Sequence, residues 1–91
     1  MFVIISYDIV DDKRRTKLAK KLKDYATRVQ YSVFEANLEP QQYAKLKGLV
    51  AKSINTKEDS VRLYRLCRPC IENVELLGKG EVTHDEDFYI L

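Results

Sequence analysis

The sequence contains little glycine and histidine, and each shortage excludes a class of function. With three glycines in 91 residues, the chain has no glycine-rich loop to hold nucleotide phosphates. It also lacks the G-x-S-x-G segment that presents a catalytic serine. The single histidine, His84, lies in an acidic segment, so Ser/His/Asp catalysis has no natural set of residues. Phosphate-loop chemistry and serine-based hydrolysis are therefore excluded.

Long hydrophobic runs are also missing. The apolar run Phe2–Ile5 has no basic residue before it and is soon followed by Asp8, so it is too short for a signal peptide or a membrane span. We expect a cytoplasmic protein without a membrane partner. A chain of 91 residues accommodates one domain. A domain this small buries only roughly 60–65% of its unfolded surface, so a protein partner would add stability.

Only two cysteines are present, Cys67 and Cys70, and they form one C-x-x-C motif. Such a motif is typical of half a zinc site or of a redox pair. A closed zinc site needs four ligands, and His84 is distant in sequence. We place the pair at a strand end beside Pro69, away from a helix start, and expect two reduced, structural cysteines. Their redox state and role stay open.

Charge is unevenly distributed although the net charge is only +2. Residues 1–28 carry eight Lys/Arg against four Asp/Glu, and residues 41–70 carry seven against two. Residues 71–91 carry one lysine against six acids. A basic body with an acidic tail indicates a polyanionic partner and a separate task for the tail. Solvated helix faces are an equally good explanation from charge alone.

Hydrophobic periodicity indicates alternating strands and helices. Asp11 or Asp12 would cap a first helix that runs to about Ala26, and Pro40 fits the first turn of a second. Residues 29–38 read as one bent strand or two short ones. The other expected strands are residues 2–9, 61–67 and 71–77.

This order predicts an α+β, ferredoxin-like β-α-β-β-α-β sandwich, in which two helices cover one face of the sheet. The ferredoxin-like domain would span residues 1–80. Residues 81–91 would form an acidic tail whose apolar end, Phe88–Leu91, adds a short extra strand to a sheet edge. The first strand is apolar on both faces, so a second copy should cover the face that the helices leave open. We therefore expect a homodimer with its sheets facing.

Asp8 is the strongest candidate for chemistry. A carboxylate that ends an apolar strand is costly unless it is solvated, paired or bound to a cation. A capping or ion-paired aspartate is the simpler interpretation. The alternative is a Mg²⁺ site, because Mg²⁺ usually takes one or two carboxylates together with phosphate oxygens. One protomer offers half a site, and a two-fold axis near the strand ends would let both copies of Asp8 share one ion.

Basic residues at the start of the first helix form a candidate phosphate-binding surface. Positive charge there opposes the helix dipole, so stability alone would not favour it. The cluster comprises Lys13, Arg14, Arg15 and Lys17, and further cations come from Arg28, Arg62, Arg65 and Arg68. Aromatic residues accompany these cations, but on strands they are more often core than base-stacking platforms; they are Tyr7, Tyr31, Phe34 and Tyr64.

Three segments together resemble the "Cas-two" family of CRISPR-associated proteins. They are Tyr7-Asp8-Ile9 with the following residues 11–15, Arg28–Glu35, and Val61–Cys67. The resemblance implies a ferredoxin-like homodimer whose sheets face each other and whose C-terminal segment, here residues 81–91, pairs with the partner protomer. It also implies a role in spacer acquisition, in which the dimer bridges two dimers of the CRISPR integrase ("Cas-one") and supports incoming duplex DNA.

The same resemblance implies site residues. Some family members are described as Mg²⁺-dependent endonucleases on single-stranded RNA or double-stranded DNA, and Asp8 matches their metal-binding aspartate. Positions associated with activity or nucleic-acid contact are matched by Tyr7, Arg15, Lys17, Arg28, Ser32 and Phe34. Lys17 stands where some members have arginine, and this exchange loses a bidentate phosphate contact.

Three functions remain open at this point. The first is a metal-dependent endonuclease, with Asp8 holding Mg²⁺ and Arg15 or Arg28 stabilising developing charge. The second is a rigid, non-catalytic adaptor between nucleic acid and integrase, which the small number of catalytic groups favours as the biological role. The third is a toxin-like RNA nuclease of the same fold. The preferred substrate, the activating pH and cleavage by the isolated protein stay undetermined.

Overall fold

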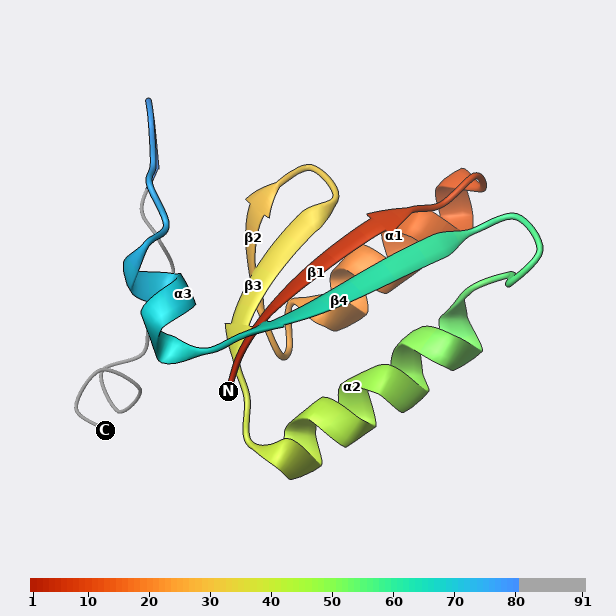
Figure 1. Ribbon diagram of the computed structural model, residues 1–91. Helices are drawn as coiled ribbons and strands as arrows, with labels where there is room; N and C mark the ends of the chain where they lie inside the picture. The colour runs from red at the N-terminus through yellow and green to blue at the C-terminus, as the bar shows by residue number, and fades with distance from the viewer. Residues whose placement is uncertain (81–91) are drawn as a thin grey trace.

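The computed structural model describes residues 1–80, which form one four-stranded sheet and three helices (Figure 1). The strands are β1 (Phe2–Asp8), β2 (Thr27–Gln30), β3 (Val33–Asn37) and β4 (Ser60–Leu66). The helices are α1 (Asp12–Leu22), α2 (Pro40–Ser53) and α3 (Arg68–Glu72). The predicted acidic tail, with His84 and the extra strand Phe88–Leu91, lies outside the described residues.

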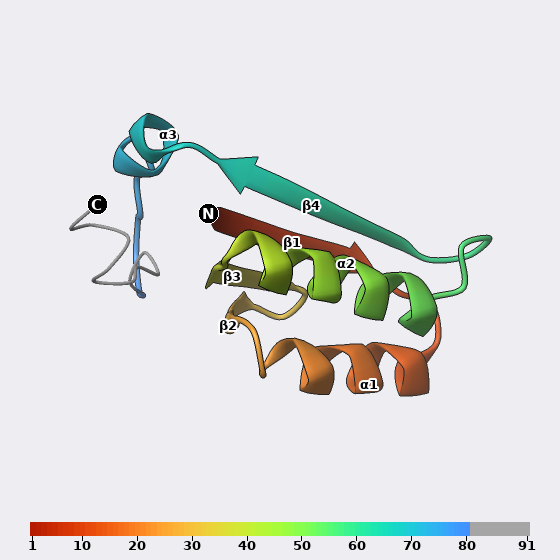
Figure 2. The same ribbon diagram turned by 90° about the horizontal axis from the view of Figure 1, so that it is seen from below.

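The sheet has the order β2-β3-β1-β4, and every pair of neighbours is antiparallel. β1 lies inside the sheet, where Ile4 is opposite Glu35 of β3 and Tyr64 of β4. The helices α1 and α2 pack on the same face of this sheet, as Figure 2 shows. This arrangement confirms the predicted ferredoxin-like α+β fold.

The core explains why one face of β1 is so apolar. Val3, Ile5 and Tyr7 alternate onto the helix-covered face, where their exposed fractions are between 0% and 5%. They pack against apolar residues of both helices: Leu18, Ala19, Leu22, Leu46 and Val50. Phe2, Ile4, Ser6 and Asp8 alternate onto the opposite face, which α1 and α2 leave open and where Phe2 is buried but Asp8 is exposed. We call this second surface the open face.

The helix starts agree with the prediction, but the end of α1 does not. Asp11 caps α1, and its carboxylate accepts a hydrogen bond of 2.9 Å from the backbone N–H of Arg14. Pro40 occupies the first turn of α2, as expected. The first helix ends at Leu22 instead of Ala26, because the chain turns there to enter β2; the N–H groups of Tyr25 and Ala26 both donate to the Leu22 carbonyl.

Two further strand predictions are resolved by the structure. Residues 29–38 belong to two strands, β2 and β3, separated by a turn at Tyr31 and Ser32. The predicted strand over residues 71–77 is wrong, because Pro69 starts the helix α3, where a fixed φ and a missing N–H are tolerated. Cys67 is the N-cap of this helix, so the expectation that the cysteines lie away from a helix start is also wrong. Within residues 1–80 no helix is long and apolar enough to cross a membrane.

Candidate functional site

Asp8 lies at the carboxyl end of β1, exposed to solvent on the open face. Its register partner is Ser60, at the start of β4. Within residues 1–80 its carboxylate makes no hydrogen bond or ion pair, so it is a solvated group and not the ion-paired or capping aspartate of the simpler interpretation. Asp11, three residues later, provides the helix cap instead.

Residues 1–80 contain no group of three or more His, Cys, Asp or Glu side chains that would hold a metal ion. Asp8 is therefore a single carboxylate donor that is exposed and unpartnered. This donor set fits Mg²⁺ only as a fraction of a site, because the ion takes six oxygen ligands. Water, phosphate oxygens or a second Asp8 would have to supply the others.

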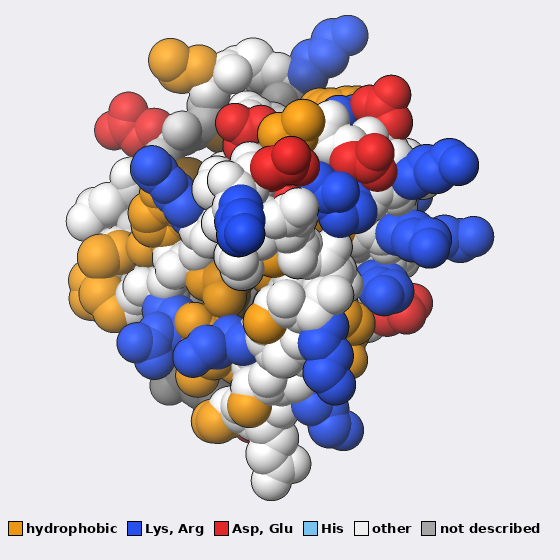
Figure 3. All heavy atoms as spheres, turned by 90° about the vertical axis from the view of Figure 1, so that its right-hand side faces the viewer, with side chains coloured by type: hydrophobic (Ala, Val, Ile, Leu, Met, Phe, Trp, Pro, Cys, Tyr) orange, Lys and Arg blue, Asp and Glu red, His pale blue; other side chains and the backbone are white. Residues whose placement is uncertain are grey.

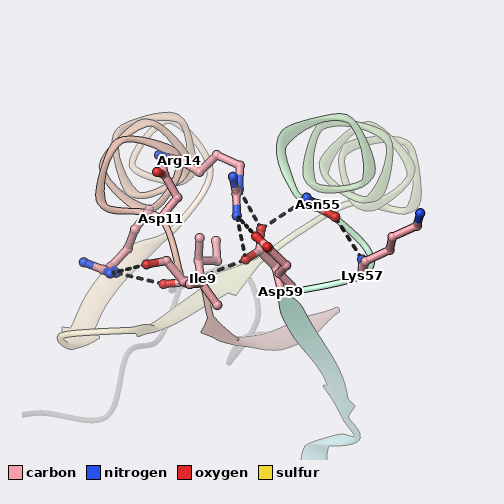
Figure 4. A network of polar contacts seen from close by, with 9 residues as sticks. Ile9, Asp11, Arg14, Asn55, Lys57 and Asp59 are labelled. Carbon is pink, nitrogen blue, oxygen red and sulfur yellow. Dashed lines mark hydrogen bonds and ion pairs between the residues drawn. The ribbon is translucent and has the colours of Figure 1, made fainter.

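Arg14 does not belong to a free phosphate-binding cluster, because an ion-pair network occupies its guanidinium (Figure 4). Its Nε donates to Oδ2 of Asp59 at 2.8 Å, and its Nη2 donates to Oδ1 of Asp59 at 3.1 Å and to Glu58 at 3.2 Å. The Asp59 side chain is 0% exposed. Arg14 thus ties the start of α1 to the start of β4.

Asp59 also accepts two backbone hydrogen bonds, from Val10 at 3.1 Å and from Asn55 at 2.9 Å. The hydrogen bonds from Arg14 are the main cause that holds the pKa of Asp59 well below its usual range, and the two backbone N–H groups add to it. Burial opposes this shift but is outweighed. Sequence reasoning missed Asp59, since no local pattern shows which acid would meet a cation 45 residues away.

The guanidinium of Arg15 is likewise occupied, by hydrogen bonds to residues close to it in sequence. Its Nη1 donates to Asp12 at 2.6 Å, and its Nε donates to the carbonyl of Ile9 at 3.2 Å. Acids thus largely balance the positive charge of Arg14 and Arg15 at the start of α1. The unfavourable interaction of these two arginines with the helix dipole is therefore no longer evidence for a phosphate-binding role. Lys13 and Lys17 are exposed and remain available for phosphate.

A basic groove lies between α1 and β2, further along the helix than the predicted cluster. It is a hollow of about 330 Å³ lined by Arg15, Thr16, Ala19, Lys20, Lys23, Arg28 and Tyr31. An adjoining hollow of about 420 Å³ is lined by Lys17, Lys20, Lys21 and Asp24. Lys20, Lys21 and Lys23 were not among the predicted site residues, although their spacing on the outer side of an amphipathic helix would have placed them beside Lys17. Figure 3 shows many Lys and Arg side chains spread over the end of the molecule where α1 begins.

Arg28 is held in this groove by aromatic rings. Its guanidinium carbon lies 5.2 Å from the ring centre of Phe34 and 5.7 Å from that of Tyr31. Phe34 is fully buried and stacks on Tyr7, with ring centres 6.2 Å apart. Ser32 lies in the β2–β3 turn, and its carbonyl accepts a hydrogen bond from the Tyr7 N–H at 3.1 Å. Tyr7 and Phe34 are thus core residues that support Arg28, as expected for strand aromatics.

The structure does not bring all the predicted site residues together. Arg28 is paired with Phe34 and lies on the helix-covered side of the sheet, whereas Asp8 lies on the open face. The cation that shares the open face with Asp8 is Arg62, which is opposite Ser6 and donates to the Tyr64 hydroxyl at 3.4 Å. Tyr64 is 44% exposed, so the expectation that it is core was wrong; the same holds for Tyr31, which is 70% exposed.

These features define the class of protein. A sheet of order β2-β3-β1-β4 with two helices on one face and an apolar open face is a ferredoxin-like α+β domain. The family described as "CRISPR associated protein Cas2" matches residues 1–74, and the chain belongs to this family.

Individual relatives agree with this assignment. The chain is 45% identical to the protein named CRISPR-associated endoribonuclease Cas2 3 of Chloroflexus aurantiacus, over 100% of this chain and 98% of the relative. The crystal structure of Streptococcus pyogenes Cas2 aligns with a TM-score of 0.75 and 36% identity, covering 86% of this chain and 100% of that one. A chain of a partial Cas6-RT-Cas1–Cas2 complex aligns with a TM-score of 0.74 and 32% identity, covering 84% and 89%.

Proposed function

We propose that this chain acts in CRISPR adaptation in the cytoplasm, as a homodimer that binds nucleic acid, joins integrase dimers and has a Mg²⁺-dependent endonuclease activity. The observation that carries the proposal is the solvated Asp8 at the end of the central strand, in a chain 45% identical over its whole length to a protein named an endoribonuclease. Replacing Asp8, as set out in the Discussion, tests the activity.

The open face supports the homodimer. A row of apolar side chains crosses it, and a free surface of this kind normally has a partner. The register places these half-buried or exposed residues on that face: Ile4, Val33, Tyr64 and Leu66. Because Asp8 ends the same face, two sheets packed face to face about a two-fold axis would bring the two copies of Asp8 toward each other.

The dimer gives a prediction for Tyr64. Tyr64→Asp should raise the dimer dissociation constant at least about 100-fold, because it replaces an aromatic ring of the apolar row by a charged group. Sedimentation equilibrium over a concentration series measures this constant. Tyr31→Asp is the matched control, since Tyr31 is an exposed tyrosine away from the open face. A Tyr64→Asp protein that remains dimeric like the control would show that the open face is not the interface.

The basic groove supports binding to the nucleic-acid backbone. Lysine and arginine contacts to phosphate release counterions and carry no base information, so binding should be insensitive to sequence and sensitive to salt. Duplex DNA and single-stranded RNA both offer this backbone. Tyr31, exposed at the rim of the groove, adds a ring on which an unpaired base can stack.

The groove gives a second prediction. Replacing Lys20, Lys23 and Arg28 together by glutamine should flatten the slope of log affinity against log salt by about 2 to 3, close to one per lost phosphate contact. Fluorescence anisotropy with labelled duplex DNA at several salt concentrations measures the slope. The triple replacement of Lys45, Lys52 and Lys57 removes the same charge from exposed positions elsewhere and should leave the slope nearly unchanged. Equal effects of both triples would exclude the groove as the contact surface.

The roles in cleavage follow from the open face. Asp8 is the residue that would hold Mg²⁺, with the second copy of Asp8 or phosphate oxygens completing the ligands. When bound, Mg²⁺ supplies positive charge that polarises a phosphodiester and favours deprotonation of the attacking water. Arg62 lies on the same face and would stabilise negative charge developing on phosphate, in place of the more distant Arg28. The groove residues bind the nucleic-acid backbone on the other side of the sheet.

An adaptor role is the second candidate, and one observation favours it. A structural neighbour of this chain belongs to a complex that contains Cas1. In that role the dimer would bridge two integrase dimers, and cleavage would not be required. Residues 81–91 would contribute acidic groups and a short strand to assembly. Spacer acquisition by a protein without Asp8 separates the two roles.

A further inference from the structure

The two cysteines lie side by side at the junction between β4 and α3. Their Sγ atoms are 3.2 Å apart, and both side chains are exposed. Cys67 directly follows β4, and Cys70 lies in α3. The backbone maintains this arrangement, since the N–H of Ile71 donates to the Cys67 carbonyl at 3.1 Å and the Ile71 side chain is 3% exposed. Two thiols held this close need little movement to form a bond.

The surroundings make the two thiols unequal. The hydrogen bond between the sulfur atoms, followed by the backbone N–H of Cys70, holds the pKa of Cys67 below its ordinary value. The same sulfur contact raises the pKa of Cys70. A thiolate is the reactive form, and the backbone N–H of Cys70 directed at the Cys67 sulfur stabilises that form, so Cys67 is the favoured first nucleophile.

Metal binding is a weaker explanation of the pair. Within residues 1–80 no third His, Cys, Asp or Glu joins these cysteines in a metal-binding group, and a structural zinc site uses four ligands. The chain contains no other cysteine. The chemistry left to two adjacent, accessible thiols is exchange with a disulfide.

We propose that Cys67 and Cys70 are a reversible dithiol–disulfide pair that reacts with low-molecular-weight disulfides, with Cys67 as the attacking and Cys70 as the resolving thiol. This inference is independent of the proposed function, because it involves neither Asp8, the basic groove nor the open face.

The reaction balances in two exchange steps with oxidised glutathione as the oxidant. The Cys67 thiolate attacks one glutathione sulfur, the glutathione disulfide breaks, and one reduced glutathione leaves with a proton. Cys70 then loses its proton and attacks the Cys67 sulfur, which breaks the mixed disulfide and releases the second glutathione. The two protein thiols are oxidised to one disulfide, and one glutathione disulfide is reduced to two thiols.

The expected consequence is local. A cross-link between residues 67 and 70 closes a very short loop, so it removes little entropy from the unfolded chain. It does join the end of β4 to α3, a helix of five residues that is too short to be stable alone. Oxidation should therefore stabilise α3 at the end of the edge strand β4, and reduction should let α3 open more often.

The first test uses the full chain and oxidised glutathione, followed by intact mass spectrometry. Wild type should lose two hydrogens without gaining glutathione, and dithiothreitol should restore the original mass. Cys70→Ser should retain a glutathione adduct on Cys67. In the reduced wild-type protein, brief treatment with iodoacetamide should form an adduct on Cys67 at least about ten times faster than on Cys70. A wild-type protein that keeps both thiols, or that forms only disulfides between chains, would overturn the pair. Equal adduct rates would overturn the assigned order of attack.

The second test is amide hydrogen exchange of the reduced and oxidised wild-type protein. The N–H groups of Ile71 and Asn73, which donate to the carbonyls of Cys67 and Cys70, should exchange several-fold more slowly after oxidation. Amides of β1 should exchange at the same rate in both states. Unchanged exchange at Ile71 and Asn73 would contradict the proposed effect on α3.

Discussion

Asp8→Asn is expected to lower Mg²⁺-dependent cleavage of RNA or duplex DNA at least about 100-fold while the protein stays folded and dimeric. Asparagine has nearly the same shape but lacks the charge that attracts the ion. Because Asp8 is exposed and has no partner within residues 1–80, its replacement leaves no buried group unsatisfied. Cleavage of labelled substrates with and without Mg²⁺ measures the activity, and circular dichroism monitors the fold.

Glu75→Gln is the matched control, since Glu75 is an exposed carboxylate that follows α3 and lines neither basic hollow. It should cleave like wild type. Full cleavage by Asp8→Asn would remove Asp8 from the mechanism. Spacer acquisition by the same variant separates the roles: acquisition that survives without cleavage supports the adaptor, whereas its loss in a folded, integrase-bound variant would make cleavage the biological role.

Asp59→Asn is expected to lower the melting temperature by roughly 10 °C or more. Each carboxylate oxygen of Asp59 accepts from two donors: Oδ1 from Val10 and Arg14, and Oδ2 from Arg14 and Asn55. An amide in either orientation therefore points its NH₂ group at N–H donors and leaves Arg14 without its charged partner. Thermal unfolding followed by circular dichroism measures the change.

Glu58→Gln provides the control within the same network. Glu58 meets the same guanidinium at 3.2 Å, but its side chain is 54% exposed. Solvent screens such a pair, so its loss should move the melting temperature by less than about 4 °C. Equal effects of the two variants would mean that the buried position of Asp59 does not matter.

The same carboxylate gives a dependence of stability on pH. The pKa of Asp59 is lower in the folded state than in the unfolded chain, so its contribution is complete above the unfolded value, about 4. It is lost progressively as the pH falls from there toward the folded value. Wild type should therefore lose stability on acidification in this window, and Asp59→Asn should lose less.

Much of the fold could be predicted from local pattern. The nearly continuous apolar run in Phe2–Asp8 is typical of an interior strand, and this segment forms β1. Pro40 marks the start of α2 at the observed residue. The strand predicted over residues 71–77 failed because its apolar residues have no sheet neighbour in the described fold. Pro69 and the burial of Ile71 favour a short helix instead.

The candidate site was predictable only in part. Asp8 stood out because a carboxylate at the end of an apolar strand needs an explanation, and the structure shows it exposed. The cluster of arginines after it was misleading, since Arg14 and Arg15 are paired with acids. Lys20 and Lys23 were not predicted as site residues, because they form a basic groove only together with Arg28, which lines the same hollow from β2.

The sequence by itself determined the fold class, the family resemblance and the prominence of Asp8, because hydrophobic period, turn residues and motif spacing are local properties. Only the tertiary structure decided which charges are free. Arg14 and Asp59 are 45 residues apart in sequence, yet Nε of Arg14 lies 2.8 Å from Oδ2 of Asp59. The register of the strands, with side chains alternating between the two faces, puts Asp8 and Arg28 on opposite faces of the sheet. These pairings depend on strand register and helix packing, which no local pattern contains.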